Sequence, residues 1–446
     1  MNLPLLCPRQ KARQRNMKLR HSIFLWIVAG WIPATSMQAQ ATSINIAVIS
    51  DVHVMAPSLL IKEGSAFDNY VKHDRKMLKE SPALLEELTG QLLKARPQFV
   101  LLTGDLTKDG EEVSHHYLVE HCLNPLKEAG IPTLVIPGNH DINNPHAVSF
   151  YGDSKERVTC ISPEEFAGIY ADFGYREALA RDKYSLSYVY QLTPEIRILA
   201  LDACKYEEND FDKDICRHDG RIKPETMAFI KSQMADARSK GIRVLGMMHH
   251  GLIEHWKYQN KVIPGYVIDD RKKIRKALAK EGLQVLFTGH AHAQDIVYDK
   301  GIYDIETGSL VSYPSPFRMV TLEDHTLTLH SHTIRSIPYD TKGADFRQYA
   351  RAHTAEGFKT VAASMFPDKV PAELKEKAVN LVAEAMSDHY QGDETLTEEK
   401  RKEIKETGKA LRKYSFKWSM VFKMVTNSLW SDKKPADNEL IITLKK

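Results

Sequence analysis

The chain has 446 residues, of which 43% are hydrophobic and 27% are charged, and this composition excludes wholesale disorder. Its formal net charge of +3 is uneven, because residues 1–40 hold six basic residues and no acidic one. Removing these six from the 61 lysines and arginines leaves 55 basic against 58 acidic residues. That balance excludes long nucleic acids as the main partner, because binding them needs a basic surface.

The N-terminal segment has the order of a secretory signal. Lys18 and Arg20 precede an apolar run over 23–32, and the Ala-Gln-Ala sequence at 39–41 supplies small residues for cleavage. The run is about ten residues long, whereas a helix needs about 20 to span a bilayer. We therefore expect residues 1–41 to be an N-terminal extension with a signal peptide. A buried or membrane-anchoring helix is the alternative.

Export would bring the cysteines beyond residue 41 into an oxidising compartment. Cys122, Cys160, Cys204 and Cys216 allow three pairings, which sequence does not resolve. Cys204 and Cys216 form the pair that is easiest to close, with 11 residues between them. Free buried thiols are an equal alternative.

Short β-rich runs alternate with helical stretches as far as about residue 302. The runs are 44–49, 99–102, 133–136, 198–201, 244–248 and 285–287. Apolar residues with helical spacing over 84–92 and 274–278 mark helices between them. This alternation predicts an α/β fold with buried strands. Alternating polarity over 319–330 predicts a hairpin.

The composition changes near residue 340, after which the chain is rich in charge and helical in pattern. Residues 374–385 have one apolar face, and a longer face over 404–429 follows a capping-box pattern, Thr395-x-x-Glu398. We expect an α/β domain over 42–338 and a helical C-terminal region over 339–446. This region is a lid, a dimerisation element or a packing element, and packing is the simplest reading.

Side chains that bind metals follow five of the six β-rich runs. They are Asp51 and His53; Asp105; Asn139, His140 and Asp141; His249 and His250; and His290 and His292. The carboxyl ends of strands in an open α/β sheet meet at one crevice, so we expect these groups to converge. Carboxylates, an amide and imidazoles suit manganese, iron or zinc better than calcium.

The spacing of these residues favours two ions. In Asp-x-His and His-x-His, positions i and i+2 of an extended chain point the same way, so both side chains can face one ion. Glycines at 104, 138 and 289 fit tight turns that bring the backbone close to the site. Seven ligand groups are too many for one ion. Two ions about 3.5–4 Å apart, bridged by a carboxylate, would use all of them.

The five motifs, in this order, resemble the motif set of the calcineurin-like metallophosphoesterases over residues 44–335. The resemblance implies a two-sheet β-sandwich flanked by helices, with residues 42–338 as the catalytic domain. It also implies two divalent metal ions. Asp51, His53 and His292 would hold one ion, Asn139, His249 and His290 the other, and Asp105 would bridge them. A metal-activated water would attack phosphorus, and His140 would be the catalytic residue that protonates the leaving group.

The sequence departs from the family pattern at two positions. Many members have an aspartate that orients the catalytic histidine where this chain has Lys108, and Asp109 is the candidate substitute. Lys108 also argues against the purple acid phosphatase branch, which has a metal-binding tyrosine there. Gly251 replaces a common proline after His249 and His250. We prefer His249 as the ligand, with His250 supporting it or facing substrate, and we assign similar candidate roles to Asp141 and Asp202.

We expect an exported phosphoester hydrolase, periplasmic or extracellular, with no transmembrane span in the mature chain. Its substrate would be small, such as a nucleotide or a phospholipid head group. A phosphodiester is favoured, because no arginine adjoins a metal motif to hold a dianionic terminal phosphate. A phosphomonoesterase with the same core and a catalytically silent metal-binding protein are the alternatives. We also hypothesise that Tyr70, His73, Asp74 and Arg75 select the substrate. Sequence leaves the oligomeric state open.

Overall fold

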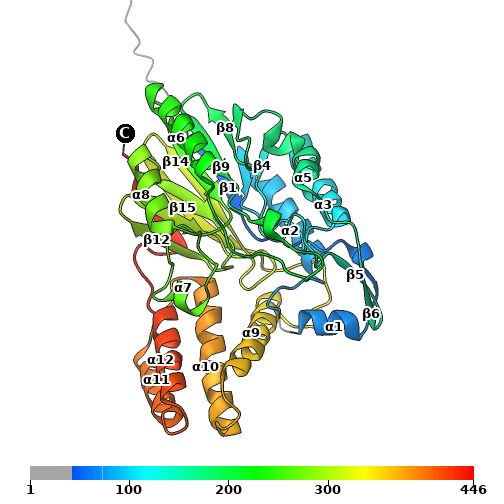
Figure 1. The fold of residues 1–446 in the computed structure, drawn as a ribbon, viewed down its shortest axis with the longest axis vertical. Coiled ribbons are helices and arrows are strands. Elements are labelled where there is room, and N and C mark those ends of the chain that lie inside the picture. The colour runs from blue at the N-terminus through cyan, green and yellow to red at the C-terminus, as the bar shows by residue number, and fades with distance from the viewer. Residues whose placement is uncertain (1–42, 73, 446) are drawn as a thin grey trace, which may run out of the picture. The chain divides into compact units, whose positions relative to one another are not determined.

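The computed structural model of the protein describes residues 43–72 and 74–445. The expected signal segment over 1–41 and His73 lie outside the described residues. Two mixed sheets share one apolar core, and helices cover their outer faces (Figure 1). The predicted α/β fold, a two-sheet β-sandwich flanked by helices with a helical C-terminal part, is confirmed.

The first sheet has six strands, and the first β-rich run lies inside it. In spatial order they are β16 (Glu439–Thr443), β15 (Thr326–Thr333), β14 (Pro316–Glu323), β1 (Ser43–Ile49), β3 (Phe99–Leu102) and β4 (Thr133–Val135). β1, β3 and β4 are parallel, so their carboxyl ends lie on one edge of the sheet. The predicted hairpin is β14 and β15.

The second sheet has seven strands, and its central strands are also parallel. In spatial order they are β12 (Asp295–Asp299), β13 (Ile302–Glu306), β11 (Val285–Thr288), β10 (Arg243–Met248), β9 (Ile196–Leu201), β8 (Tyr188–Thr193) and β7 (Ala180–Arg181). β9 is buried along its whole length, as expected of a strand covered on both faces. All six predicted β-rich runs are therefore strands.

Helices occupy most of the connections between strands. They are α1 (Ser65–Val71), α2 (Ser81–Ala95), α3 (Glu112–Leu118), α4 (Asn124–Glu128), α5 (Pro163–Ile169), α6 (Pro224–Ser239), α7 (Gln259–Val262) and α8 (Arg271–Glu281). A small sheet of β2 (Leu60–Lys62), β5 (Val148–Tyr151) and β6 (Ser154–Arg157) lies beside α1. Ile230 of α6 and Leu278 of α8 pack with Leu199 in one apolar cluster, so these two helices cover the second sheet.

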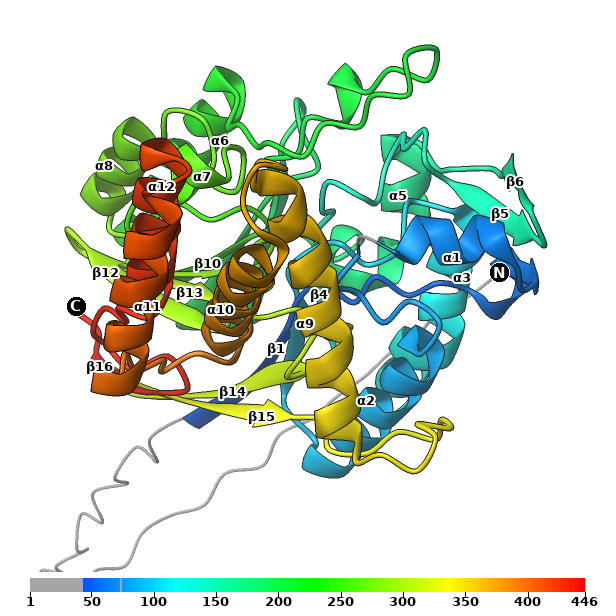
Figure 2. The same cartoon turned by 90° about the horizontal axis from the view of Figure 1, so that it is seen from below.

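Four helices form most of the C-terminal region, which the view from below shows in front of the strands (Figure 2). They are α9 (Phe346–Met365), α10 (Ala372–Gln391), α11 (Glu398–Leu411) and α12 (Phe416–Leu429). The expected continuous helical face over 404–429 is wrong, because Ser415 caps a new helix. The predicted cap at Thr395 is also wrong, since the side chain of Thr397 accepts from the Lys400 amide.

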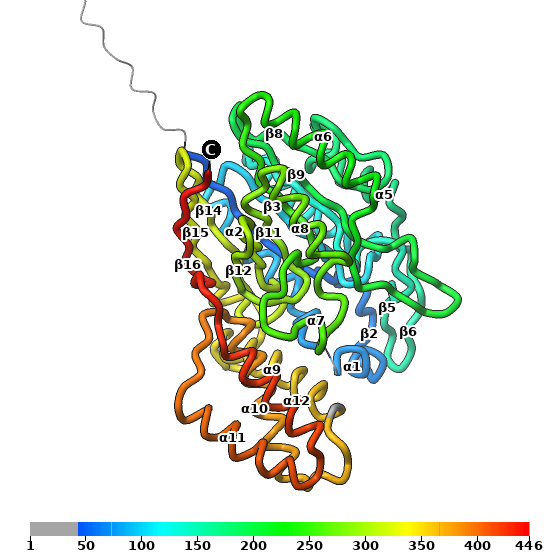
Figure 3. Tube along the Cα trace, turned by 60° about the vertical axis from the view of Figure 1, so that its left-hand side comes forward, coloured from blue at the N-terminus to red at the C-terminus, as the bar shows by residue number. Residues whose placement is uncertain are grey.

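The last strand was not predicted. β16 pairs antiparallel with β15 and so returns the chain to the first sheet, as the Cα trace shows (Figure 3). The expectation of helix up to the end is therefore wrong for Glu439–Thr443, where burial alternates with period two. None of the helices in the described residues is long and apolar enough to cross a membrane.

The four cysteines of the described chain are free thiols. The pair that is easiest to close by spacing, Cys204 and Cys216, is not joined. Instead, the Cys204 thiol is buried 3.4 Å from the Pro137 carbonyl oxygen. Free thiols were one of the two alternatives left open by the sequence.

Candidate metal centre

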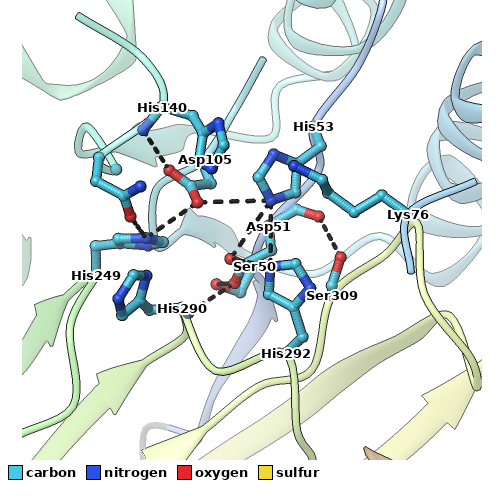
Figure 4. Close-up of polar contacts among 12 residues, drawn as sticks. Ser50, Asp51, His53, Lys76, Asp105, His140, His249, His290, His292 and Ser309 are labelled. Atoms are coloured by element: carbon cyan, nitrogen blue, oxygen red, sulfur yellow. Dashed lines mark hydrogen bonds and ion pairs between the residues drawn. The ribbon is translucent and has the colours of Figure 1, made fainter. Parts of the chain in front are cut away.

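The site is built by loops that leave the carboxyl ends of five strands. Asp51 and His53 follow β1, Asp105 follows β3, Asn139 and His140 follow β4, His249 follows β10, and His290 and His292 follow β11. All eight residues come together, and Figure 4 shows Asp105 between His53 and His249. The convergence expected from the strand order is therefore found.

Two sets of ligand atoms share one carboxylate oxygen. Asp105 Oδ2 lies 3.5 Å from His53 Nε2 and 3.3 Å from His249 Nε2. Asp51, His53, Asp105 and His292 form one group with metal-ligating atoms close together, and Asp105, His249 and His290 form another. Asn139 joins the second group, since its Oδ1 lies 3.2 Å from His249 Nε2. The structure thus brings all seven predicted ligands together, in two groups that share Asp105.

The donor atoms fit divalent ions. Nε2 of His292 lies 3.2 Å from Asp51 Oδ1 and 3.3 Å from His53 Nε2. Ligand atoms about 2.1 Å from a common ion are about 3.0–3.4 Å from each other in octahedral or tetrahedral geometry. Asp51 Oδ1 and His290 Nε2 are buried without a hydrogen-bond partner in the described part of the chain. Buried polar atoms without partners are costly, and a metal ion would satisfy them.

Five of the ligand residues have a strained, left-handed backbone conformation. Asp51, His53, Asp105, His290 and His292 have φ between 41° and 74°, which side-chain-bearing residues rarely adopt. Such conformations cost about 1 kcal/mol or more each and cluster at functional sites.

Two glycines let the loops approach the ligands. A Cβ on Gly138 would lie 2.1 Å from Asp105 Oδ1, and one on Gly289 would lie 2.5 Å from Asp51 Oδ2. The close backbone approach that the sequence predicts at these glycines is confirmed.

Hydrogen bonds outside the ligand groups fix their orientation. His249 Nδ1 donates to the Thr103 carbonyl oxygen at 2.9 Å, which directs Nε2 toward Asp105. The His290 amide donates to Asp51 Oδ2, and the Ser309 hydroxyl donates to the Asp51 carbonyl oxygen. Thr103 and Ser309 were not predicted, because these contacts join segments far apart in sequence.

Burial sets the charge of most of the imidazoles. It lowers the pKa of His53, His290 and His292 below the usual value, so these side chains are neutral and keep a lone pair for an ion. For His249, burial is outweighed by the Asp105 carboxylate, which raises its pKa to about 9. A divalent ion bound by His249 would displace this proton.

His140 lies beside the ligands and is held by Asp109. Its Nδ1 is 2.8 Å from Asp109 Oδ1, and its backbone N–H donates to Asp105 Oδ1. Burial and Lys76 lower the pKa of His140, but Asp105 and Asp109 outweigh them and raise it. With Nδ1 bound to Asp109, Nε2 is the nitrogen left to exchange a proton with a substrate.

Lys108 does not face the metal site. It is fully buried, with Nζ 2.8 Å from Asp109 Oδ2 and 2.7 Å from Glu111 Oε1, and it lies over the ring of Tyr70. The Tyr70 hydroxyl also donates to Asp109. Asp109 thus takes the orienting position that the sequence left open, and Lys108 keeps that carboxylate ionised.

Three other predicted residues have supporting or distant positions. His250 is buried behind His290, with ring centroids 4.4 Å apart. Asp141 accepts from the backbone of Leu106, Thr107 and Gly138, and so joins two ligand loops. Asp202 accepts from Leu186, Cys204 and Tyr206, and no contact of it with the seven ligands is found among the described residues.

A cavity of about 260 Å³ opens over the two ligand groups. Its lining comprises Tyr70, Asp74, Arg75, Lys76, Asp105, Asn139, His140, His218, Tyr266, His290 and His292. Three of the four residues hypothesised to select the substrate therefore line it, and the fourth, His73, is outside the described residues. Lys76 was not predicted, although it stands next to Arg75 in the same polar run.

The family model of the calcineurin-like phosphoesterases matches residues 44–294, more than half of the chain. The chain belongs to this family. A comparison with curated proteins finds no match.

Several solved structures are similar in fold. A dimetal phosphatase from Danio rerio has 14% identity and a TM-score of 0.46, with 65% of this chain and 96% of that chain covered. GAP50 of Plasmodium has 11% identity and a TM-score of 0.35, over 71% and 95%. Vps29 of Entamoeba histolytica with zinc has 14% identity and a TM-score of 0.27, over 65% and 92%.

Proposed function

We propose that the protein is an exported hydrolase of small phosphoesters that works with two divalent metal ions, manganese, iron or zinc. The observation that carries this proposal is the position of Asp105 Oδ2 between two ligand groups, with His140 beside it. Family membership supports the class of reaction. The donor set, rich in imidazole, supports the choice of metals.

The residues of the site have different roles in this reaction. Two divalent ions held by the seven ligands would supply an acidic water as nucleophile and would neutralise charge on the phosphoryl group. Asp105 keeps the two ligand groups in register, because its Oδ1 is fixed by the His140 amide while Oδ2 faces both. His140 donates a proton to the leaving oxygen, and Asp109 holds its ring for that transfer.

The sequence favours phosphodiesters as substrates, but the cavity lining removes the reason for that preference. No arginine adjoins a metal motif in sequence, yet Arg75 and Lys76 line the cavity. The cavity can therefore stabilise more negative charge than a simple diester carries. A phosphomonoesterase with the same core is the second candidate, and these two cations favour it.

The test compares bis(p-nitrophenyl) phosphate with p-nitrophenyl phosphate, using chain stripped by a chelator and reloaded with manganese. A manganese-dependent preference for the diester, lost in His140→Ala, supports the proposal. Preference for the monoester, also lost in His140→Ala, would establish the phosphomonoesterase with the same chemistry. Two bound metals without turnover of either ester would indicate a silent metal-binding protein.

Export is tested separately. The chain would be expressed with residues 1–41 present, and the N-terminus of protein recovered outside the cytoplasm would be sequenced. An N-terminus near residue 42 is expected, and recovery of the uncleaved chain in the cytoplasm would contradict export.

A further inference from the structure

We infer that Arg75 and Lys76 form an anion subsite beside the metal centre, which takes a second anionic group of the substrate next to the phosphoester that is hydrolysed. This inference rests on the proposed function and narrows its substrate class. The ligand would be a phosphoester that also carries a phosphate or a carboxylate close to the reacting phosphorus.

Lys76 is a buried cation that faces the site. Its side chain is 7% exposed, and Figure 4 shows it extending toward His53. Asp74 is the one carboxylate within ion-pair distance of Lys76 in the described residues, with Oδ2 3.6 Å from Nζ. The Lys76 ammonium therefore has one distant carboxylate partner and can pair with an anionic ligand in the cavity.

Arg75 stands beside Lys76 in the lining, and its Nε is buried without a hydrogen-bond partner in the described residues. Its guanidinium lies over the ring of Phe358, 5.7 Å from the centroid, and beside the phenol of Tyr390. These neighbours carry no negative charge at neutral pH. Asp74 is therefore the only carboxylate within ion-pair distance of either cation among the described residues.

The turn that presents the two cations is braced by its own carboxylate and by the C-terminal region. Asp74 Oδ1 accepts from the amides of Arg75 and Lys76 at 2.7 and 3.0 Å. Thr354 of α9 donates to the Arg75 carbonyl oxygen at 3.4 Å. His353, also of α9, lies with Nε2 3.2 Å from the Lys76 carbonyl oxygen.

One face of α9 thus holds the turn over the metal site. Gly357 lies so close that a Cβ there would be 2.3 Å from the Asp74 carbonyl oxygen. The bracing makes Arg75 and Lys76 a preformed pair, which lowers the entropic cost of binding.

Charge balance points to a ligand with more than one negative group. Two divalent ions bring four positive charges, and Asp51 and Asp105 remove two. Arg75 and Lys76 add two more, against Asp74 alone. A diester with a single charge would offset only part of this excess, whereas a substrate with a further phosphate or carboxylate would offset more of it.

The experiment is equilibrium binding to the full chain loaded with manganese, measured by calorimetry. Methyl phosphate is the reference probe, phosphoglycolate adds a carboxylate, and inorganic diphosphate adds a phosphoryl group. Bound manganese is assayed after each titration. The variants are Arg75→Gln with Lys76→Gln, the charge-preserving Arg75→Lys, and Lys79→Gln as a matched control, because Lys79 pairs with Glu63 outside the cavity lining.

At least one of the two probes that carry a second anionic group should bind the wild type about tenfold or more tightly than methyl phosphate. The double variant should lose this ratio, whereas Arg75→Lys should keep most of it and Lys79→Gln all of it. The probe that benefits identifies the second group as phosphate or carboxylate. A ratio near one in the wild type, or a ratio unchanged in the double variant, would overturn the subsite.

If the double variant does not fold, Arg75→Gln alone is used instead. Loss of the affinity ratio in Arg75→Gln, with the ratio kept in Arg75→Lys, would equally support the subsite. Binding does not require turnover. A chain that hydrolyses nothing would defeat the proposed function and still test the subsite.

Discussion

The Nδ1 atom of His140 and the Oδ1 atom of Asp109 are 2.8 Å apart, in a chain where the family's usual orienting aspartate is replaced by Lys108. The orienting carboxylate has moved by one residue. Its second oxygen is held by Lys108 at 2.8 Å.

Replacing Asp109 should therefore impair catalysis more than metal binding. For Asp109→Asn we expect kcat to fall by about 100-fold, because the His140 ring loses the carboxylate that orients it. Glu111→Gln is the matched control, since Glu111 pairs with the same Lys108 without touching His140. Steady-state kinetics and metal analysis of both variants decide the matter. An equal loss of kcat in the control would mean that Lys108, rather than Asp109, is the critical group.

Asp105 should be the residue on which both ions depend. In Asp105→Asn the shared oxygen loses its charge, so we expect the bound metal to fall well below two ions per chain and hydrolysis to fall with it. Elemental analysis after dialysis measures this. Asp202→Asn is the control, because Asp202 is also buried but contacts Leu186, Cys204 and Tyr206 instead. Retention of two tightly held ions in Asp105→Asn would contradict a bridging role.

Helix α9 should affect the site through a single small residue. Gly357→Ala places a methyl group against the Asp74 carbonyl oxygen, so we expect a raised KM and a loss of about 1–3 kcal/mol in stability. Gly90→Ala in α2 is the opposite case, because its Cβ would meet nothing within 4 Å. It should gain about 0.5–1 kcal/mol and leave KM unchanged. Thermal unfolding and kinetics of both variants provide the comparison, and an unchanged KM in Gly357→Ala would separate α9 from the site.

Stability should decrease as the pH rises from about 6.5 to 9. Burial lowers the pKa of His389, but the carboxylates of Glu394 and Asp295 outweigh burial and raise this pKa to about 9. The folded state therefore binds a proton on His389 more tightly than the unfolded state does. The stabilisation of the fold that results is complete below about pH 6.5 and is lost as the pH rises through 9. Burial also raises the pKa of Glu306 to about 8, which acts in the same direction.

The pH effect is measured from the free energy of unfolding in urea at fixed metal load. His389→Gln should flatten the slope between pH 7 and 9, in addition to any general destabilisation. His389 is not one of the seven metal-centre ligands, but with Asp295 and Glu394 it forms a separate group that could itself hold an ion, so the metal content of both chains is measured and held equal. A slope as steep in the variant as in the wild type would rule out His389 as its source.

Local sequence signals predicted the strands and the ligand loops, because the ligands sit directly after apolar runs and beside glycines. Asp51 and His53, for example, directly follow β1 in the sequence. Arg75 was hypothesised from the sequence to select the substrate, whereas a role for the neighbouring Lys76 was not predicted. Their position depends on α9, whose His353 contacts the Lys76 carbonyl across 277 residues of sequence.

The helix boundaries in the C-terminal region were predicted wrongly for a different reason. Periodicity continues smoothly through residues 404–429, so the pattern suggested one helix. The chain turns at Ser415, where a side-chain cap and packing of α12 against α11 outweigh continuation. β16 was missed for a similar reason, since five residues of alternating burial carry little information without the neighbouring strand.

The return of β16 to the first sheet makes the helical region an insertion rather than a tail. The chain leaves the sheet after β15, forms α9 to α12 and comes back to add a strand at the sheet edge. A shortened chain that simply stops before α9 would also strip that edge and leave β15 with unpaired backbone groups, a template for aggregation. The helices can be removed cleanly only by joining β15 to β16 with a short turn. Such a hairpin would preserve the β-sandwich and would remove the contacts of α9 with the turn that carries Arg75 and Lys76.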